Sequence, residues 1–190
     1  MEQNFISDKI FKSTNDNVVS LEKGLYENCE FINCDFSKFN FSEFRFVDCT
    51  FNSCNLSLAK LILTVLQNTK FIACKMLGLH FDACNGIGIS FGFDGCILNH
   101  STFYKLKIRN TVFKGTQLIE TDFSECDLTS AVFNKCELSG AVFDNTNLEK
   151  VDFRGSVNYS IDPENNRIKG AKFSITNITG LLDKYGIQIE

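Results

Sequence analysis

The sequence contains no tryptophan, a single proline and only two histidines, and it lacks any long apolar stretch. No window approaches about 18 consecutive apolar residues, which excludes a membrane-spanning helix. The N-terminal residues have no basic start followed by an apolar run, so we do not expect a secretory signal. His80 and His100 have no cysteine or aspartate pattern around them that would form a catalytic set. We therefore expect no enzymatic activity and no bound cofactor.

The charges are unevenly distributed along the chain, although the net charge is only −4. Residues 1–55 carry a net charge of −4, residues 56–114 carry +5 and residues 115–190 carry −5. A basic belt therefore lies between two acidic ends. The belt makes direct nucleic-acid binding worth considering. By register only Tyr104 among the nearby aromatic residues would point outward to stack on a base, so we do not expect such binding.

Phenylalanine is abundant, with 20 residues, and many of them recur at a fixed interval. One column advances by 20 residues at every step except the step from Phe91 to Phe113, which is 22. Such regularity is the signature of a solenoid, in which each repeat packs only on its neighbours. The column consists of Phe31, Phe51, Phe71, Phe91, Phe113, Phe133, Phe153 and Phe173.

A period of five residues lies beneath the period of twenty. From Leu98 to Phe153 every fifth residue is Phe, Leu or Ile, and a mostly small residue precedes each of these centres by two positions. Periods of 3.6 and 2.0 both fail, which argues against an amphipathic helix and an ordinary strand. Two inward positions in every five predict a short extended side that ends in a turn. Four such sides complete a coil of 20 residues, and the two extra residues predict a bulge near residues 92–97.

The nine cysteines support this register, because all of them occupy the small position two residues before a centre. Cysteine behaves as a small hydrophobic residue when it is buried. Along a straight column the thiols would not converge on a tetrahedral point, and no histidine joins them, so we expect no metal site. An odd number of cysteines without an export signal indicates free thiols and a cytoplasmic protein.

The runs Cys126-Asp-Leu-Thr-Ser and Ala131-Val-Phe-Asn-Lys resemble the five-residue consensus of the pentapeptide repeat proteins. This resemblance implies an all-β fold, a right-handed quadrilateral β-helix, which would have about seven coils over residues 29–178 at about 4.8 Å per coil. Residues 154–172 break the consensus and predict an irregular coil. Residues 1–28 precede the clear repeat, and we expect them to form an N-terminal cap of short helix or irregular structure.

Residues 179–190 leave the repeat and predict a short helix followed by a strand. The ending is similar to that of the quinolone-resistance (Qnr-like) pentapeptide repeat proteins, in which a C-terminal segment forms a homodimer. The resemblance therefore implies a dimer interface built from the C-terminal group, which we define as Leu181, Leu182, Tyr185, Ile187 and Ile189.

The same resemblance implies a DNA mimic that binds type II topoisomerase, either DNA gyrase or topoisomerase IV, and gives protection from quinolones. Ordered carboxylates on a rod can occupy a basic groove built for duplex phosphates. The candidates form the acidic group, which we define as Glu120, Asp122, Glu125, Glu137 and Asp144.

The alternative hypothesis is a scaffold or regulatory binding module with an unknown protein partner. It rests on large apolar residues at positions that should face water. These form the apolar group, which we define as Leu58, Ile62 and Leu63.

Overall fold

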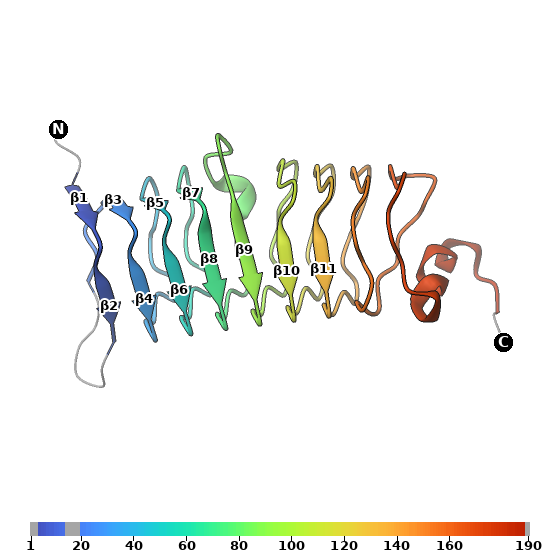
Figure 1. The fold of residues 1–190 in the computed structure, drawn as a ribbon, viewed down its shortest axis with the longest axis horizontal. Helices are drawn as coiled ribbons and strands as arrows, with labels where there is room; N and C mark the ends of the chain where they lie inside the picture. Colours follow the sequence, from blue (N-terminus) through green and yellow to red (C-terminus); the bar gives the residue numbers. More distant parts are fainter. Residues whose placement is uncertain (1–3, 14–19, 189–190) are drawn as a thin grey trace.

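The computed structural model describes residues 4–13 and 20–188 of the chain. Figure 1 shows a row of coils stacked along one axis, with the two ends of the chain at opposite ends of the row. No helix in the described part of the chain is long and apolar enough to cross a membrane. A rod of this shape presents long outer sides, and every side chain that leaves the core does so on one of them.

Two parallel sheets run along the rod, and each strand pairs with the equivalent strand of the next coil. Side four is a four-stranded sheet of β1 (Asn4–Ser7), β3 (Gly24–Glu27), β5 (Arg45–Val47) and β7 (Val65–Gln67). Side one is a seven-stranded sheet of β2 (Ile10–Lys12), β4 (Glu30–Ile32), β6 (Thr50–Asn52), β8 (Thr69–Ile72), β9 (Phe91–Asp94), β10 (Val112–Lys114) and β11 (Val132–Asn134).

Single parallel bridges join the other two sides of successive coils. Side two includes the bridges Asp35↔Asn55 and Gln117↔Glu137, and side three includes Asn40↔Lys60 and Asp122↔Val142. Within one coil the chain passes from side one to side four in numerical order, at Phe31, Phe36, Phe41 and Phe46. The predicted all-β coil of four sides is therefore confirmed.

The chain turns at nearly every corner through a residue in the left-handed conformation. The residue two places after a centre usually has a positive φ, for example Asn33 at 53°, Lys38 at 59° and Gly78 at 62°, with Ala83 as an exception. This conformation is uncommon for residues other than glycine, asparagine and aspartate. The five-residue period therefore has a local cause, because a left-handed residue in every five forces a bend before the strand can lengthen.

Phenylalanine rings stack along the inside of side one. The centroids of Phe31 and Phe51 are 4.5 Å apart, and those of Phe113 and Phe133 are 4.7 Å apart. The planes within each pair are inclined by 13° and 7°, which gives nearly parallel rings. Stacked aromatic pairs at this separation contribute beyond the area that they bury.

The prediction that Phe91 belongs to this column, with a bulge near residues 92–97, is wrong. In the register of side one, Phe71 pairs with Phe93 and Phe93 pairs with Phe113, whereas Phe91 lies beside Thr69. The amide of Asn85 still donates to the carbonyl of Thr64, at the regular spacing of 21 residues. The two extra residues therefore lie between Asn85 and Phe91, where the chain leaves the line of coils.

This departure is visible in Figure 1 as the green segment that stands out between β8 and β9. It begins with a short 3-10 helix, η1 (Phe81–Ala83), and continues through Gly86, Ile87 and Gly88. Gly88 has a φ of 68°, a conformation that glycine adopts readily because it has no side chain. The sequence pattern could not separate two phenylalanines two residues apart, because either one would continue the column.

The prediction of an N-terminal cap over residues 1–28 is also wrong for the described residues. Strand β1 pairs with β3 and β2 pairs with β4, so the coil starts near Asn4. The ring of Phe11 stacks on Phe31 at 5.0 Å with an interplanar angle of 8°. The separation of these two residues is again 20, so the signal for an earlier coil was present in the sequence.

The last coil is irregular, and the chain after it is helical. A bridge between Asp152 and Lys172 shows that the stretch between them makes one complete coil. Two 3-10 helices follow, η2 (Ile175–Leu181) and η3 (Asp183–Tyr185). The predicted strand is not seen at residues 187–188, and residues 189–190 lie outside the described part of the chain.

Candidate partner-binding surfaces

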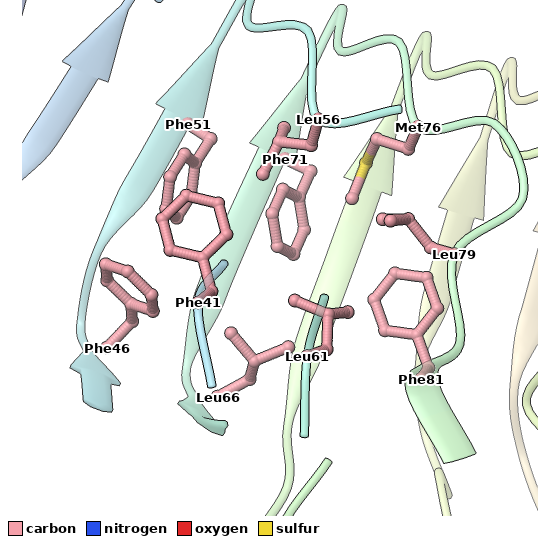
Figure 2. Close-up of a pocket in the computed structure, with 10 residues that line it drawn as sticks. All are labelled: Phe41, Phe46, Phe51, Leu56, Leu61, Leu66, Phe71, Met76, Leu79 and Phe81. Carbon is pink, nitrogen blue, oxygen red and sulfur yellow. The ribbon is translucent and has the colours of Figure 1, made fainter. Parts of the chain in front are cut away.

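The cavity among the buried side chains of the described coils is too small for a ligand. Figure 2 shows a cavity where phenylalanine centres give way to leucine, as from Phe46 to Leu66 and from Phe41 to Leu61. Its volume is about 10 Å³ and all ten lining residues are apolar. A buried water needs at least that volume together with polar partners, so we expect this cavity to be dry. Any partner of the described chain must therefore be bound on the outside.

The nine cysteines are buried and unpaired. The Sγ of Cys54 donates to the carbonyl of Phe31, and the Sγ of Cys136 donates to that of Phe113, both at 3.3 Å. Burial raises the pKa of the Cys49 thiol, and also that of Cys126, to about 12. The thiols of Cys49 and Cys126 are therefore protonated at neutral pH, and they donate to the carbonyls of Tyr26 and Phe103 in the adjacent coil. In the described part of the chain no three His, Cys, Asp or Glu side chains converge on a possible metal position.

The structure brings the acidic group onto two adjoining sides of the rod. Asp122 lies on side three between Thr102 and Val142 of the neighbouring coils, and Glu137 lies on side two. Glu120 and Glu125 occupy left-handed corners at the two edges of side three. Asp144, which is exposed, follows Val142 on side three one coil further along. The predicted set thus shares one region of the surface.

Hydrogen bonds from neighbouring residues hold these carboxylates in place. The amide of Ser124 donates to Asp122 at 2.8 Å, and Asn158 donates to both oxygens of Glu137. Burial acts to raise the pKa of Glu137, but hydrogen bonds from Ser139 and Asn158 outweigh it and lower the pKa. Glu137 therefore stays ionised at neutral pH and points in a defined direction.

Two members of the acidic group also have basic neighbours. Glu125 lies 3.5 Å from the Nζ of Lys105 and accepts a hydrogen bond from Tyr104 at 2.9 Å. Glu120 lies 3.1 Å from the Nδ1 of His100. Such exposed pairs contribute about 0–1 kcal/mol and are screened by salt, so they would not prevent a partner from competing for the carboxylates.

The apolar group lies on side three near the N-terminal half of the rod. The side chains of Leu58, Ile62 and Leu63 are 55%, 54% and 58% exposed. Sequence reasoning missed Ile87, which is 81% exposed on the segment that leaves the line of coils. Because that segment departs from the repeat, the five-residue period could not predict whether Ile87 faces outward. The only unusual feature of Ile87 in the sequence is its position between two glycines.

The C-terminal group is divided between the core and the surface. Leu181 packs against the core and Leu182 is half-buried, whereas Tyr185 and Ile187 are exposed. Ile189 lies outside the described residues. Two further exposed apolar residues, Ile175 and Ile178, lie in η2 of the same segment and were not predicted.

The C-terminal segment is attached to the last coil by polar contacts. The Nζ of Lys184 lies 2.7 Å from Asp162 and 2.5 Å from Glu164, and the hydroxyl of Tyr185 donates to Glu164 at 3.1 Å. The amide of Ile161 donates to the carbonyl of Gly180 at 2.9 Å. The segment therefore closes the end of the coil and presents its remaining apolar residues outward.

The stacked coils, the five-residue register and the filled interior define a repeat protein whose function lies on its outer sides. The chain belongs to the pentapeptide repeat family, because the family model described as a pentapeptide repeat region matches residues 26–92 and 89–160. No curated protein matches the sequence.

Two solved structures of QnrB1 share the fold. A trypsin-treated variant of QnrB1, a plasmid-mediated fluoroquinolone resistance protein, is 18% identical, with a TM-score of 0.64 over 98% of this chain and 100% of that chain. A second trypsin-treated QnrB1 variant is 17% identical, with the same TM-score and all of both chains covered. HetL from the cyanobacterium Nostoc sp. strain PCC 7120, involved in heterocyst differentiation regulation, is 12% identical, with a TM-score of 0.49 over 90% of this chain and 83% of that chain.

Proposed function

We propose that this protein is a non-enzymatic interaction protein that binds type II topoisomerase, DNA gyrase or topoisomerase IV, as a mimic of duplex DNA. The observation that carries the proposal is the acidic group, whose carboxylates stand on two adjoining sides of a rigid rod. Successive coils repeat at about the strand spacing of 4.8 Å, so the charges form an ordered array. A groove that binds duplex phosphates would attract such an array.

Two findings support this choice of partner: the fold that this chain shares with QnrB1, and the description of QnrB1 as a resistance protein. QnrB1 is described as a fluoroquinolone resistance protein, and this chain has the same fold. By that similarity, binding of the topoisomerase would protect the enzyme from quinolones. The free, buried thiols fit a reducing compartment, and we place the protein in the cytoplasm.

Neutralising the acidic group tests this function. The variant with Asp122→Asn, Glu137→Gln and Asp144→Asn keeps the side-chain shapes but removes three charges. If each charge contributes about 0.5 kcal/mol to binding, the concentration needed to protect or inhibit gyrase should rise about tenfold. The measurement is gyrase supercoiling with and without a quinolone.

Asp94→Asn is the matched control, because Asp94 is an exposed carboxylate on side one, where it pairs with Lys114 at 2.8 Å. We expect this variant to behave like the wild type. If the wild-type protein neither protects nor inhibits gyrase at roughly micromolar concentration, the topoisomerase proposal fails.

We also propose that two copies associate through the C-terminal group. Tyr185 and Ile187 are exposed at the end of the rod, and Ile175 and Ile178 are exposed apolar residues of the same C-terminal segment. Burying such residues between two copies would remove apolar area from water. Ile187→Asp should therefore convert a dimer to a monomer in sedimentation equilibrium, whereas Val157→Asp on side two should leave the mass unchanged. A monomeric wild type would contradict the proposal.

A scaffold that binds another protein partner is the second candidate function. It rests on a separate observation, the apolar group, which lies on the N-terminal half of the rod and away from the acidic group. The two functions use different surfaces and could exist together.

A further inference from the structure

We propose that the apolar group, together with Ile87, is a docking site for a protein segment that presents large apolar side chains between carboxylates. The site is independent of the topoisomerase proposal, because it uses none of the acidic group. Its features are a groove, two leucines in an unfavourable backbone conformation and a rim of unpaired cations.

The groove lies where the segment that leaves the line of coils overhangs side four. It has a volume of about 360 Å³ and is lined by Glu43, Arg45, Leu63, Val65, Gln67, Asn85 and Ile87. Val65 belongs to β7, the last strand of the four-stranded sheet. Gln67 lies beneath the overhanging segment, since a Cβ on Gly88 would be 2.8 Å from its Nε2. The groove is large enough to receive one or two apolar side chains of a partner.

The backbone conformation of two leucines indicates that the stability of the fold does not favour leucine at these two corners. Leu58 and Leu63 have φ values of 59° and 57°, and no other large apolar residue in the described chain has a positive φ. The other corners use mainly polar residues or glycine, which tolerate this conformation or remain in water. Both leucines are more than half exposed. Unfavourable conformations of residues that stay largely exposed are found at functional sites.

The unpaired charges around the site are positive. Lys60 lies between Leu58 and Ile62 along side three, Arg45 lines the groove, and the amide of Lys38 donates to the carbonyl of Ser57, next to Leu58. None of these three cations forms an ion pair with another described residue.

Two carboxylates also lie near the site, fewer than the three cations. Glu43, which lines the groove, pairs with Lys23 at 2.5 Å, and Asp82 lies 3.4 Å from the Nδ1 of His80. A partner with carboxylates beside its apolar side chains would therefore be complementary, whereas a second copy of this surface would bring like charges together.

The test uses a fluorescein-labelled amphipathic peptide with leucines on one helical face and glutamates on the other. Two matched peptides replace every glutamate with lysine or every leucine with serine. Fluorescence anisotropy should show that the leucine–glutamate peptide binds the full-length protein, weakly at high salt, and that both matched peptides bind at least about tenfold more weakly.

Variants of the protein locate the site. Ile62→Asp and Lys60→Glu should each weaken binding about tenfold or more, whereas Val112→Asp on side one should not change it. Leu63→Asn should weaken binding and at the same time raise the melting temperature, because asparagine tolerates a positive φ. This opposite change in binding and stability is not expected of a structural residue. None of these variants should alter the gyrase assay.

Several results would overturn the proposal. One is equal binding of the lysine peptide, and another is binding that Ile62→Asp does not affect. Binding of phosphatidylglycerol vesicles without binding of the peptide would assign the surface to a membrane. Self-association that Ile62→Asp abolishes would assign it to a second copy of the chain.

Discussion

Phe113→Ala is expected to lower the free energy of unfolding by about 3–5 kcal/mol, because a buried ring would be replaced by a cavity. Phe113 has no exposed surface, and its ring stacks between Phe93 at 5.2 Å and Phe133 at 4.7 Å. Removing it leaves two ring faces without a partner in the middle of the rod. Urea unfolding followed by circular dichroism measures the loss.

Phe5→Ala is the matched control for this change. Phe5 lies in β1 near the end of the rod and is 61% exposed, so its removal should cost less than about 0.5 kcal/mol. A loss below about 1 kcal/mol for Phe113→Ala would mean that the inward side of the coil has been misassigned.

Gly180→Ala is expected to release the C-terminal segment from the last coil, with a loss of about 2–3 kcal/mol. A Cβ at this position would lie 2.0 Å from the carbonyl oxygen of Tyr159. The clash involves backbone, so no side-chain rotation relieves it, and the hydrogen bond from Ile161 to the Gly180 carbonyl would have to open. Limited proteolysis should cut the variant near residue 180 much faster than the wild type.

Gly86→Ala distinguishes a clash from a general effect of adding a methyl group. No atom lies within 4 Å of a Cβ at Gly86, and its φ is not in the left-handed region. We expect wild-type proteolysis and stability for Gly86→Ala. If Gly180→Ala also behaves like the wild type, the C-terminal segment is not docked as the structure shows.

Much of the fold could be predicted because the repeat is local. Every five residues carry their own inward pair and their own left-handed corner, so the positions of Phe113, Phe133 and Cys136 follow from counting. The coil formed by Phe11 and Phe31 could have been found in the same way. It was missed because few of the residues before Cys29 match the consensus.

The choice between Phe91 and Phe93 could not be made by counting. Both residues are buried, and both continue a pattern of alternate inward residues. The pairing of Phe93 with Phe71 depends on hydrogen bonds between coils. Their register is set by the extra residues in the segment at Gly86–Gly88, which precedes β9.

The candidate surfaces, like the fold, could be predicted from the sequence only in part. The residues of the acidic and apolar groups could be named from their outward positions, but their partners lie about 20 residues away in the sequence. The contact of Lys105 with Glu125 and the attachment of Lys184 to Asp162 result from the stacking of coils. Ile87 lies near the apolar group only because the overhanging segment brings it to the groove that Leu63 also lines.

The sequence by itself determined the four-sided coil and its inward columns, since both depend on residues five or twenty apart. It also determined the absence of a membrane-spanning stretch, which depends on the length of the apolar runs. Only the tertiary structure decided where the two extra residues lie, how the C-terminal segment closes the rod and which outward residues form a groove. These features depend on contacts between segments that share no repeat, and packing and hydrogen bonding, rather than periodicity, select them.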